Sequence, residues 1–404
     1  MSGVREKSIP GIRPRFTLHS SLITHHSSLI THHSSLITHH SSLITHHSSL
    51  ITLMKVLVLS ILAGMGHIKA TEAISEGLKK AGIEPKSFIV LHNSLLGWFI
   101  NSSYLVMTKK TPALWALFYK TPIWRISQSF LDNAIREDVE PVINEFSPDA
   151  VISTHPFIAS AISTIKNRNF KIVSCATDFD CHPMGIRPQI DLYIVPHQSI
   201  GEILKKKGVS PSAVKVVGIP ILSKFHQTKG IKKEKFGLSE KPVVLYLGGG
   251  YGLGHIEKHL LSLAKIRDKC QIVIVAGKDT HLADKLKRRL KELGLEGKVF
   301  GFIDYIDELL EIADIALGKA GGLGASEVVA KGVPLIITEA IPGQEEKNAE
   351  ILVKEGQAVW PKDAGLEIER LIADKEKFLA LKERLSRLKP PLATMEIARI
   401  LKEL

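Results

Sequence analysis

The sequence predicts an α/β protein with two Rossmann-like domains, each built on a parallel sheet, that face each other across a cleft. Three observations predict this fold class. From Met54 onward, short apolar runs alternate with amphipathic stretches, which is typical of parallel strands covered by helices on both faces. The alternation restarts once, near Pro242. A chain of 404 residues is also long enough to bury two hydrophobic cores.

The expected strands and helices form two successive sets. Strands are predicted at 54–60, 86–91, 149–153, 171–176 and 191–195, and again at 242–247, 271–276, 298–301, 314–317 and 334–338. Helices are predicted between them at 68–81, 156–168, 199–207, 255–267, 281–293 and 344–355. We therefore expect a domain at 54–222, a lysine-rich linker at 223–241, a second domain at 242–375, and helices at 376–404 that pack across the domains.

The first 53 residues are dominated by a repeat. Five copies of His-Ser-Ser-Leu-Ile-Thr, separated by single histidines, fill residues 19–52. Ser, Leu and Thr dilute the histidines for metal binding, and the adjacent Leu-Ile pairs do not supply a coiled-coil seam. An iterated DNA segment also gives such a repeat on translation. Because Met54 directly opens the first strand, we expect residues 1–53 to lie outside the fold and Met54 to be the natural start.

Charge and cysteine content narrow the class of protein. The net charge of +12 favours an anionic partner, whether nucleic acid, an acidic lipid surface or a phosphorylated substrate. No nucleic-acid-binding motif is recognised, so no nucleic-acid partner is expected. The three cysteines are odd in number and lack metal-ligand spacing, which indicates reduced thiols in a cytosolic protein. No apolar run is long enough to predict a spanning helix.

Both halves begin with a strand that runs into a glycine loop. The first loop ends in Gly64-Met-Gly66-His67, and the second reads Gly248-Gly249-Gly250-Tyr-Gly-Leu-Gly-His. Glycine lets the backbone turn sharply and approach a ligand closely, and the helix N-terminus that follows suits a phosphate. Either loop alone is equally well explained as a simple turn. The same Gly-x-Gly-His ending in both halves favours a ligand, although no acidic residue completes a dinucleotide fingerprint.

The stretch from Gly318 to Asn348 is the richest in candidate binding residues. It contains the glycine loop Gly318-Lys-Ala-Gly-Gly-Leu-Gly-Ala-Ser-Glu327 and the turn Pro342-Gly-Gln-Glu345. The loop follows a predicted strand and opens a helix, so its amides suit a diphosphate. Glu327 is expected in the first turn of that helix, where its carboxylate suits a ribose diol. The alternative is an acid that only complements the helix dipole.

These residues resemble the donor-site signature of the glycosyltransferases that make glycosyl diacylglycerols. This family contains the monogalactosyldiacylglycerol synthases and the processive diacylglycerol glucosyltransferases, and is related to the peptidoglycan lipid-II N-acetylglucosaminyltransferase. The resemblance continues through Ser60–Ala70, Thr177-Asp178, His182 and Gly218–Phe225. It implies a GT-B fold, a UDP-sugar donor, inversion at the anomeric carbon, and no cofactor or bound metal.

The resemblance also implies roles for particular residues. The amides of Gly321, Gly322 and Leu323 would hold the diphosphate, with Gly249 and Gly250 beside it. Ser326 and Glu327 would hold the ribose, Phe302 and Ile303 would lie near uracil, and Gln344 and Glu345 would reach the sugar hydroxyls. Lys319 is expected to add a phosphate contact. Gly324-Ala325 departs from the family, which commonly has a threonine there, so one hydroxyl contact is missing.

An inverting transfer needs a base for the acceptor hydroxyl, and histidine suits that task near neutral pH. His67 ends the first glycine loop and is the leading candidate. Asp178 and His155 also follow predicted strands and are further candidates. The alternative for each is an ordinary hydrogen bond within a loop. Helix and glycine amides would stabilise the leaving diphosphate.

Residues 92–130 contain eight of the 24 aromatic residues, four basic residues and no acid. Trp and Tyr favour the lipid–water boundary, and basic residues favour anionic headgroups. Some of these aromatics are also expected to fill the N-terminal core. We predict that the following residues contact the acceptor or the membrane: Gly66, Trp98, Lys109, Lys110, Trp115, Tyr119 and Trp124.

The sequence thus predicts a hexosyltransferase that moves a sugar from UDP-glucose or UDP-galactose to diacylglycerol or a glycosyl-diacylglycerol. Its C-terminal domain would bind the donor, and its N-terminal domain would face the acceptor and an anionic membrane surface. The protein would be cytoplasmic and peripheral to the inner face of the cell membrane. One alternative is transfer of N-acetylglucosamine to a polyprenyl diphosphate. An alternative of another class is a UDP-sugar epimerase, which needs no lipid surface.

Overall fold

The computed structural model describes residues 53–404, apart from 63, 93, 122–123, 251–255 and 389. Within 104–127, the side chains of several helical residues are also outside the description. The prediction that the N-terminal repeat lies outside the fold concerns residues 1–53, of which 1–52 are not described. It therefore stays a prediction, and so do the domain boundaries.

The first half of the chain forms a six-stranded parallel sheet in the order β2-β1-β3-β4-β5-β6. The strands are β1 (Lys55–Ile61), β2 (Glu84–Val90), β3 (Ala150–Ser153), β4 (Lys171–Cys175), β5 (Leu192–Val195) and β6 (Val214–Val216). The central strands β1 and β3 are buried along almost their whole length, because helices cover both faces of a parallel sheet. This burial explains why their sequences read as continuous apolar runs.

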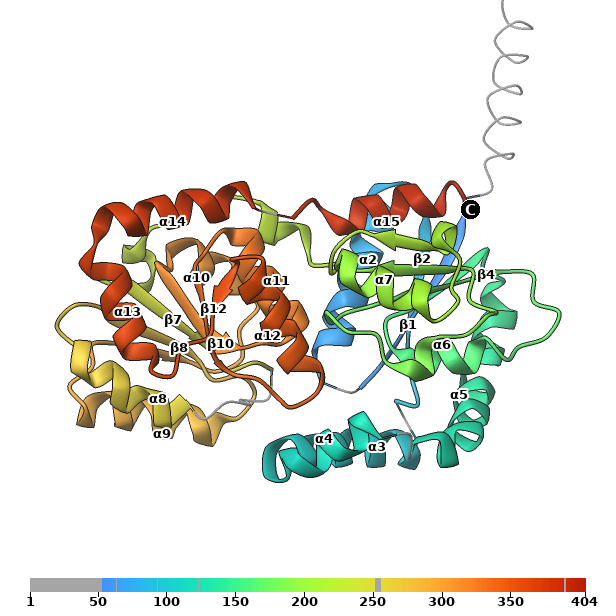
Figure 1. The fold of residues 1–404 in the computed structure, drawn as a ribbon, viewed down its shortest axis with the longest axis horizontal. Helices are drawn as coiled ribbons and strands as arrows, with labels where there is room; N and C mark the ends of the chain where they lie inside the picture. The colour runs from blue at the N-terminus through green and yellow to red at the C-terminus, as the bar shows by residue number, and fades with distance from the viewer. Residues whose placement is uncertain (1–52, 63, 93, 122–123, 251–255, 389) are drawn as a thin grey trace, which may run out of the picture. The chain divides into compact units, whose positions relative to one another are not determined.

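The helices of this half connect the parallel strands. They are α2 (Gly66–Lys80), α3 (Leu95–Lys110), α4 (Pro112–Lys120), α5 (Trp124–Phe146), α6 (Pro156–Ile162) and α7 (Gln198–Lys206). Figure 1 shows α3 and α4 in cyan, in the long connection from β2 to α5. The predicted helix at 156–168 is shorter than expected, since α6 ends at Ile162.

The second half forms another six-stranded parallel sheet, in the order β12-β11-β10-β7-β8-β9. Its strands are β7 (Val243–Leu247), β8 (Gln271–Val275), β9 (Gly297–Phe300), β10 (Ile315–Lys319), β11 (Leu335–Glu339) and β12 (Ala358–Val359). Its helices are α8 (Ile256–Leu263), α9 (Thr280–Glu292), α10 (Ile306–Ile312), α11 (Gly322–Lys331), α12 (Gln344–Lys354), α13 (Ala364–Ala373) and α14 (Lys375–Arg387). Two parallel sheets with helices confirm the predicted α/β class.

Each predicted strand coincides with an observed strand, and two observed strands were not predicted. These are β6 and β12, each of which lies at an edge of its sheet. They have only three and two residues, and β6 is mostly exposed. Strands this short carry too few residues for an apolar run, which is the pattern that identifies a strand in a sequence.

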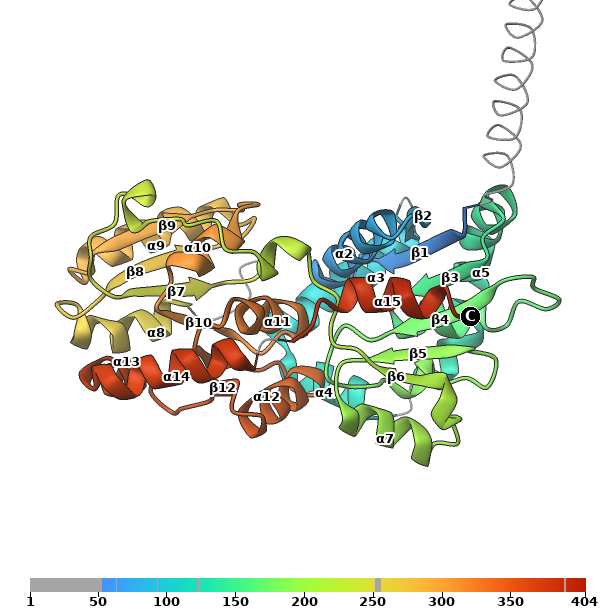
Figure 2. The ribbon, with the colours of Figure 1, turned by 90° about the horizontal axis from the view of Figure 1, so that it is seen from above.

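The last helix, α15 (Ala393–Leu401), returns to the first sheet. Ile397 and Leu401 are buried in one cluster with Val56 and Val58 of β1 and Ile74 of α2. In Figure 2, α13, α14 and α15 follow one another in red, and α15 lies beside α2. The end of the chain therefore completes the core of the half in which the described fold begins.

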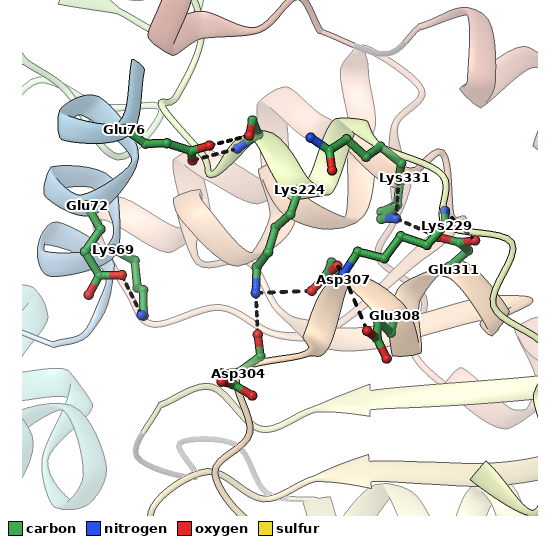
Figure 3. A network of polar contacts seen from close by, with 12 residues as sticks. Lys69, Glu72, Glu76, Lys224, Lys229, Asp304, Asp307, Glu308, Glu311 and Lys331 are labelled. Atoms are coloured by element: carbon green, nitrogen blue, oxygen red, sulfur yellow. Dashed lines mark hydrogen bonds and ion pairs between the residues drawn. The ribbon is translucent and has the colours of Figure 1, made fainter. Parts of the chain in front are cut away.

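The linker between the sheets is held by ion pairs rather than left loose. Asp307 of α10 is almost fully buried and pairs with Lys224 (3.1 Å) and Lys229 (2.8 Å) of the linker. Figure 3 shows Lys224 between Asp307 and the carbonyl oxygen of Asp304, to which it also donates. On the other side, the carboxylate of Glu76 in α2 accepts from the backbone N–H of Ser223 at 3.2 Å. The start of the linker is thus fixed to both halves.

Candidate functional site

The strand orders place two pairs of loops at the points where each sheet reverses its order. In the first sheet, β1 and β3 are neighbours, and in the second, β7 and β10 are neighbours. Connections leave such neighbouring strands in opposite directions, so a crevice opens beyond their carboxyl ends, where α/β proteins bind ligands. Beyond these strands lie His67, in the first turn of α2, and His155 in the first half, and Gly249 and Gly321 in the second.

A pocket of about 310 Å³ is lined by residues of both halves. It brings together most of the residues predicted from the sequence to bind the donor: Gly249, Gly250, Phe302, Ile303, Gly321, Gly322, Leu323, Glu327, Gln344 and Glu345. Gly66, His67 and Asp178 line the same pocket from the first half. The structure therefore shows that the predicted residues are neighbours, while their roles stay predictions.

Two of the glycines permit close approach between the halves. A Cβ atom on Gly250 would lie 2.5 Å from Cγ of Met65 in the first glycine loop. A Cβ atom on Gly322 would lie 2.2 Å from the carbonyl oxygen of Thr177 and 2.7 Å from Oδ1 of Asp178. Real Cβ atoms do not approach other atoms so closely. Packing therefore requires glycine at both positions, in addition to the predicted contact with a ligand.

Asp178, a predicted base candidate, bonds to the second half of the chain. Its Oδ1 accepts from the backbone N–H of Gly322 (3.2 Å) and from Nδ2 of Asn348 (2.8 Å). Burial, partly offset by the Asn348 bond, raises the pKa of Asp178 to about 6. The buried Asn348 amide also accepts from Phe179 N–H at 2.7 Å and donates to the Ala320 carbonyl at 2.9 Å. Asp178 therefore helps to hold the start of α11 in place.

Glu327 lines the pocket from α11, but not where the sequence placed it. Because α11 begins at Gly322, Glu327 falls in the second turn, and the expectation of a first-turn acid is wrong. Burial raises the pKa of Glu327 to about 8, despite the opposing charges of Lys224 and Lys69. A carboxyl beyond the first turn gains little from the helix dipole. This position weakens the alternative that Glu327 only complements the dipole.

Ser326 and Glu345, which were predicted to bind the ribose and the sugar, form hydrogen bonds within the protein. Ser326 is buried, does not line the pocket, and donates its hydroxyl to the Gly322 carbonyl at 2.8 Å. Glu345 is also buried, and its Oε1 accepts from the Lys319 ammonium. Its Oε2 accepts from Ile341 N–H at 2.9 Å. Each oxygen of Glu345 therefore already accepts one hydrogen bond, while the predicted contacts of Gln344 and Glu345 with sugar hydroxyls stay predictions.

The contact between Lys319 and Glu345 was not foreseen from the sequence. Lys319 lines the pocket, and its Nζ lies 3.7 Å from where a Cβ of Gly321 would stand. Its Cε lies 3.5 Å from where a Cβ of Gly249 would stand. A cation is thus placed between the two glycine loops of the second half. In the sequence, only the closeness of Lys319 to Gly321 indicated that this lysine belongs to the site. Its pairing with Glu345 could not be foreseen, because Glu345 lies on a different element.

His67 is held by the loop that follows β3. Its Nδ1 lies 2.8 Å from the carbonyl oxygen of Thr154 and 3.1 Å from the hydroxyl of Thr177. A carbonyl oxygen only accepts, so Nδ1 carries the hydrogen and Nε2 keeps its lone pair. Burial lowers the pKa of His67 to about 4. The ring is therefore neutral at pH 7, with an unprotonated Nε2.

His155 lies edge-on to His67, with ring centroids 4.7 Å apart. Its Nδ1 accepts from the backbone N–H of Phe157 at 3.2 Å, so it caps the start of α6. It lines a second pocket of about 110 Å³ rather than the first. Because Nδ1 accepts, the neutral ring carries its hydrogen on Nε2, which suits a hydrogen-bond donor better than a base.

The residues predicted to meet the acceptor or the membrane lie mainly on α3 and α4. Trp98 is 68% exposed on α3, and Trp115 on α4 is half-buried and lines the second pocket. Lys109 and Lys110 belong to α3, Tyr119 to α4, and Trp124 begins α5. The side chains of these four residues lie outside the description, so their predicted contacts stay predictions.

Comparison with family models gives two matches that together cover most of the described fold. Residues 67–221 match the model of monogalactosyldiacylglycerol synthase. Residues 244–404 match the model of the glycosyltransferase family 28 C-terminal domain. The chain is also 30% identical, over 346 residues, to a processive diacylglycerol beta-glucosyltransferase of Bacillus cereus, with 81% of this chain and 88% of that protein covered.

Solved structures with the same fold are more distant in sequence. MurG of Acinetobacter baumannii matches with a TM-score of 0.60 at 14% identity, covering 87% of this chain and all of that one. The UDP-GlcNAc 2-epimerase of Neisseria meningitidis, solved bound to UDP-GlcNAc, matches with a TM-score of 0.57 at 16% identity, covering 87% and 99%. These similarities show the fold alone, which MurG and the epimerase share.

Proposed function

Because this chain belongs to the glycosyltransferase family of the monogalactosyldiacylglycerol synthases and processive diacylglycerol glucosyltransferases, we propose that it transfers a hexose from a UDP-sugar to diacylglycerol or a glycosyl-diacylglycerol. The transfer inverts the anomeric centre and takes place at a membrane surface. The observation that carries this proposal is the pocket at the reversal point of the second sheet, where two glycine loops, Lys319 and Glu327 meet.

The donor fits this pocket by chemistry. The diphosphate lies on the amides of Gly321 and Leu323, since the Gly322 N–H already donates to Asp178, and the Lys319 ammonium lies beside them. The ribose diol binds Glu327. The uracil ring stacks on Phe302, and the Lys278 ammonium lies 5.3 Å from the centre of the Phe302 ring. The Neisseria epimerase of the same fold was solved with a UDP-sugar bound, which supports the choice of UDP.

His67 is the proposed base. Its unprotonated Nε2 takes the proton of the acceptor hydroxyl as that oxygen bonds to the anomeric carbon. The bond from this carbon to the diphosphate oxygen breaks, and its electron pair leaves with UDP. The amides of α11 and the Lys319 ammonium stabilise the developing charge. Attack from the side opposite the leaving group inverts the centre.

Product analysis tests the proposal. The purified protein is incubated with vesicles that contain dioleoylglycerol and with UDP-glucose, UDP-galactose or UDP-N-acetylglucosamine in turn. We expect a glycolipid from one of the two hexose donors. An epimerised free sugar nucleotide without glycolipid would instead favour the epimerase alternative. Formation of product only on a polyprenyl diphosphate with UDP-N-acetylglucosamine would favour the other alternative.

Glu327→Gln should weaken donor binding and also stabilise the protein. The neutral carboxyl of Glu327 offers two oxygens to the ribose hydroxyls, whereas glutamine offers one, so the affinity for UDP should fall by about 0.5–1.5 kcal/mol. In the folded protein Glu327 keeps its proton up to a pH of about 8, whereas the unfolded chain releases it above a pH of about 4.5. The contribution of Glu327 to the free energy of unfolding therefore falls as the pH rises from about 4.5 to about 8.

Removing the titrating group should raise the free energy of unfolding at pH 8 by on the order of 1 kcal/mol, with little gain at pH 5. Calorimetry with UDP and urea denaturation at both pH values measure the two effects. The matched control is Glu202→Gln on the exposed side of α7. If the Glu327→Gln variant bound UDP as tightly as the wild type, Glu327 would not be the residue that binds the ribose.

The proposed membrane contact rests on exposed apolar side chains of α3 and α4. Leu95, Trp98 and Phe99 are 88%, 68% and 62% exposed, and Leu114 and Leu117 are 53% and 60% exposed. Five such side chains on two successive helices, in a segment without acids, suit an anionic bilayer surface. In the part of the chain that the structure describes, no helix has the length and apolar character needed to cross a bilayer.

Replacing Leu95, Trp98 and Phe99 together by serine should lower binding to vesicles with anionic lipid at least tenfold, because each removes a side chain worth about 1.5–3 kcal/mol when buried. UDP affinity should not change. Cosedimentation measures the binding. A control that replaces Leu366 and Leu379, which are similarly exposed on α13 and α14, should bind like the wild type. An equal loss of vesicle binding in both variants would show that α3 is not a specific membrane-binding surface.

A further inference from the structure

The second pocket adjoins the donor pocket and has its own set of polar groups. It measures about 110 Å³ and shares His67, Thr177, Asp178 and Gln344 with the donor pocket. His155 and His182 line only the second pocket. Since His67 lines both pockets, a ligand in the second pocket would lie next to the proposed base.

His155 and His182 occur in the same local motif. Each precedes a proline, and each uses Nδ1 to accept the backbone N–H two residues later, from Phe157 at 3.2 Å and from Met184 at 3.3 Å. This bond fixes the ring relative to the backbone and places the hydrogen of the neutral ring on Nε2. The same local bond thus sets the tautomer of both rings, in loops that follow different strands.

The three rings form a complementary set. Burial lowers the pKa of His67 and of His182 to about 4, and lowers that of His155 well below its usual value. All three are therefore neutral at pH 7. His67 keeps a lone pair on Nε2, while His155 and His182 carry N–H there. One acceptor and two donors suit a hydroxyl group and neighbouring oxygens.

The charges in the second pocket favour an uncharged ligand. Among the described residues that line it there is no Lys or Arg, but there are two carboxylates, Asp178 and Asp180. Asp180 pairs with Lys347 at 2.7 Å, and Lys347 is outside the lining. A phosphate or diphosphate entering this pocket would lose its water and meet carboxylates without a matching cation, which costs free energy.

We propose that the second pocket binds the uncharged polyol-ester head of the acceptor, with His155 and His182 as positioning residues whose Nε2–H groups bind its oxygens and turn the reacting hydroxyl toward Nε2 of His67. This inference rests on the proposed transfer of a hexose to a lipid hydroxyl. In the step itself, the acceptor oxygen bonds to the anomeric carbon, its proton goes to His67, and UDP leaves with the electron pair. His155 and His182 exchange no proton.

The test replaces each positioning histidine by asparagine. Asparagine is a good helix cap, since its Oδ1 can take over the bond to the backbone N–H, but it has no group at the position of Nε2. With dioleoylglycerol and the donor that the wild type uses, we expect kcat/KM for the acceptor to fall about tenfold to a hundredfold in His155→Asn and in His182→Asn. The affinity for UDP should stay within twofold of the wild type.

The ratio of donor hydrolysis to lipid glycosylation is the decisive readout. Water needs no positioning by these donors, so slow hydrolysis of the UDP-sugar should persist and the ratio should rise about tenfold or more. This ratio reports only folded molecules, so it remains valid if a variant is less stable. The matched control is His197→Asn. His197 caps α7 in the same way, through a 3.2 Å bond from Ser199 N–H, but lines neither pocket.

Other results would overturn the inference. An unchanged hydrolysis-to-transfer ratio in both variants would remove the positioning role, and so would an equal change in His197→Asn. If the sugar were transferred to a polyprenyl diphosphate as fast as to dioleoylglycerol, the second pocket would not select an uncharged acceptor head. These failures differ from failure of the proposed function, in which the wild type neither binds UDP nor makes any glycolipid.

Discussion

Replacing His67 by alanine is expected to lower kcat about 10²- to 10⁴-fold, the range attributed to a general base. His67 has its Nδ1 bonded to the Thr154 carbonyl and its Nε2 unprotonated, and it lines both pockets. Its loss removes the proton acceptor without altering the glycine loops of the second half. The affinity for UDP should therefore be unchanged in calorimetry, while single-turnover transfer becomes slow.

The pH profile gives a second signature of this base. Because burial lowers the pKa of His67 to about 4, the ring stays unprotonated well below neutral pH. The acid limb of kcat/KM that belongs to this group should lie near pH 4, instead of near 6.5 as for an ordinary histidine. The alanine variant should lack that limb. His281→Ala, on the exposed face of α9, serves as the control.

A His67→Ala variant that keeps more than a tenth of the wild-type kcat would place the base elsewhere. Asp178 would then be the next candidate, since its pKa of about 6 suits a base. Its bonds to Gly322 and Asn348 would have to open first. Asp178→Asn separates the two cases, because asparagine can keep the bond from Gly322 but cannot take a proton.

Replacing Lys319 by methionine should reduce both activity and stability, for separate reasons. The ammonium lies beside Gly249 and Gly321, where the diphosphate is proposed to bind. Its loss should lower kcat about 10²- to 10³-fold, as when one preorganised partner of a developing charge is removed. The same change leaves the Glu345 carboxylate, only 2% exposed, without its cation. Breaking a buried pair in this way costs about 3–5 kcal/mol.

A double variant separates these two effects. Lys319→Met combined with Glu345→Gln removes both charges, so most of the lost stability should return in urea denaturation. Its kcat should remain low, because no cation faces the leaving group. Recovery of activity together with stability would show that Lys319 acts only by holding Glu345 in place. Lys331→Met, which removes the partner of Glu311 away from the pocket, tests whether loss of any half-buried pair lowers kcat.

Sequence reasoning succeeded where the signal is local. The strands of both sheets follow from apolar runs such as Met54–Ser60, because a parallel strand is buried on both faces and shows it in consecutive residues. Glycine loops after β1, β7 and β10 follow from the positions of a few residues, since only glycine permits such close backbone contact. The donor-site candidates other than Ser326 line one pocket, because they follow the carboxyl ends of strands.

The sequence did not reveal which partners the polar side chains of the site take within the protein. Glu345 and Gln344 were given the same role, yet Glu345 is taken up by Lys319 and Ile341. Ser326 was expected to meet a ribose, yet its hydroxyl bonds to its own helix. Asp178 was predicted as a candidate base, and its partners are Gly322 and Asn348 of the second half. A carboxylate or hydroxyl has several acceptable partners, and residue type does not choose among them.

The sequence by itself determined the two parallel sheets, the loops beyond their strands and the family to which these residues belong, because periodicity and glycine act over a few neighbouring residues. Only the tertiary structure decided the tautomer of His67, the bond from Asn348 to Asp178, and the return of α15 to the first sheet. The first two contacts join residues 87 and 170 positions apart. Such contacts depend on how whole elements pack, and no short stretch of sequence encodes that packing.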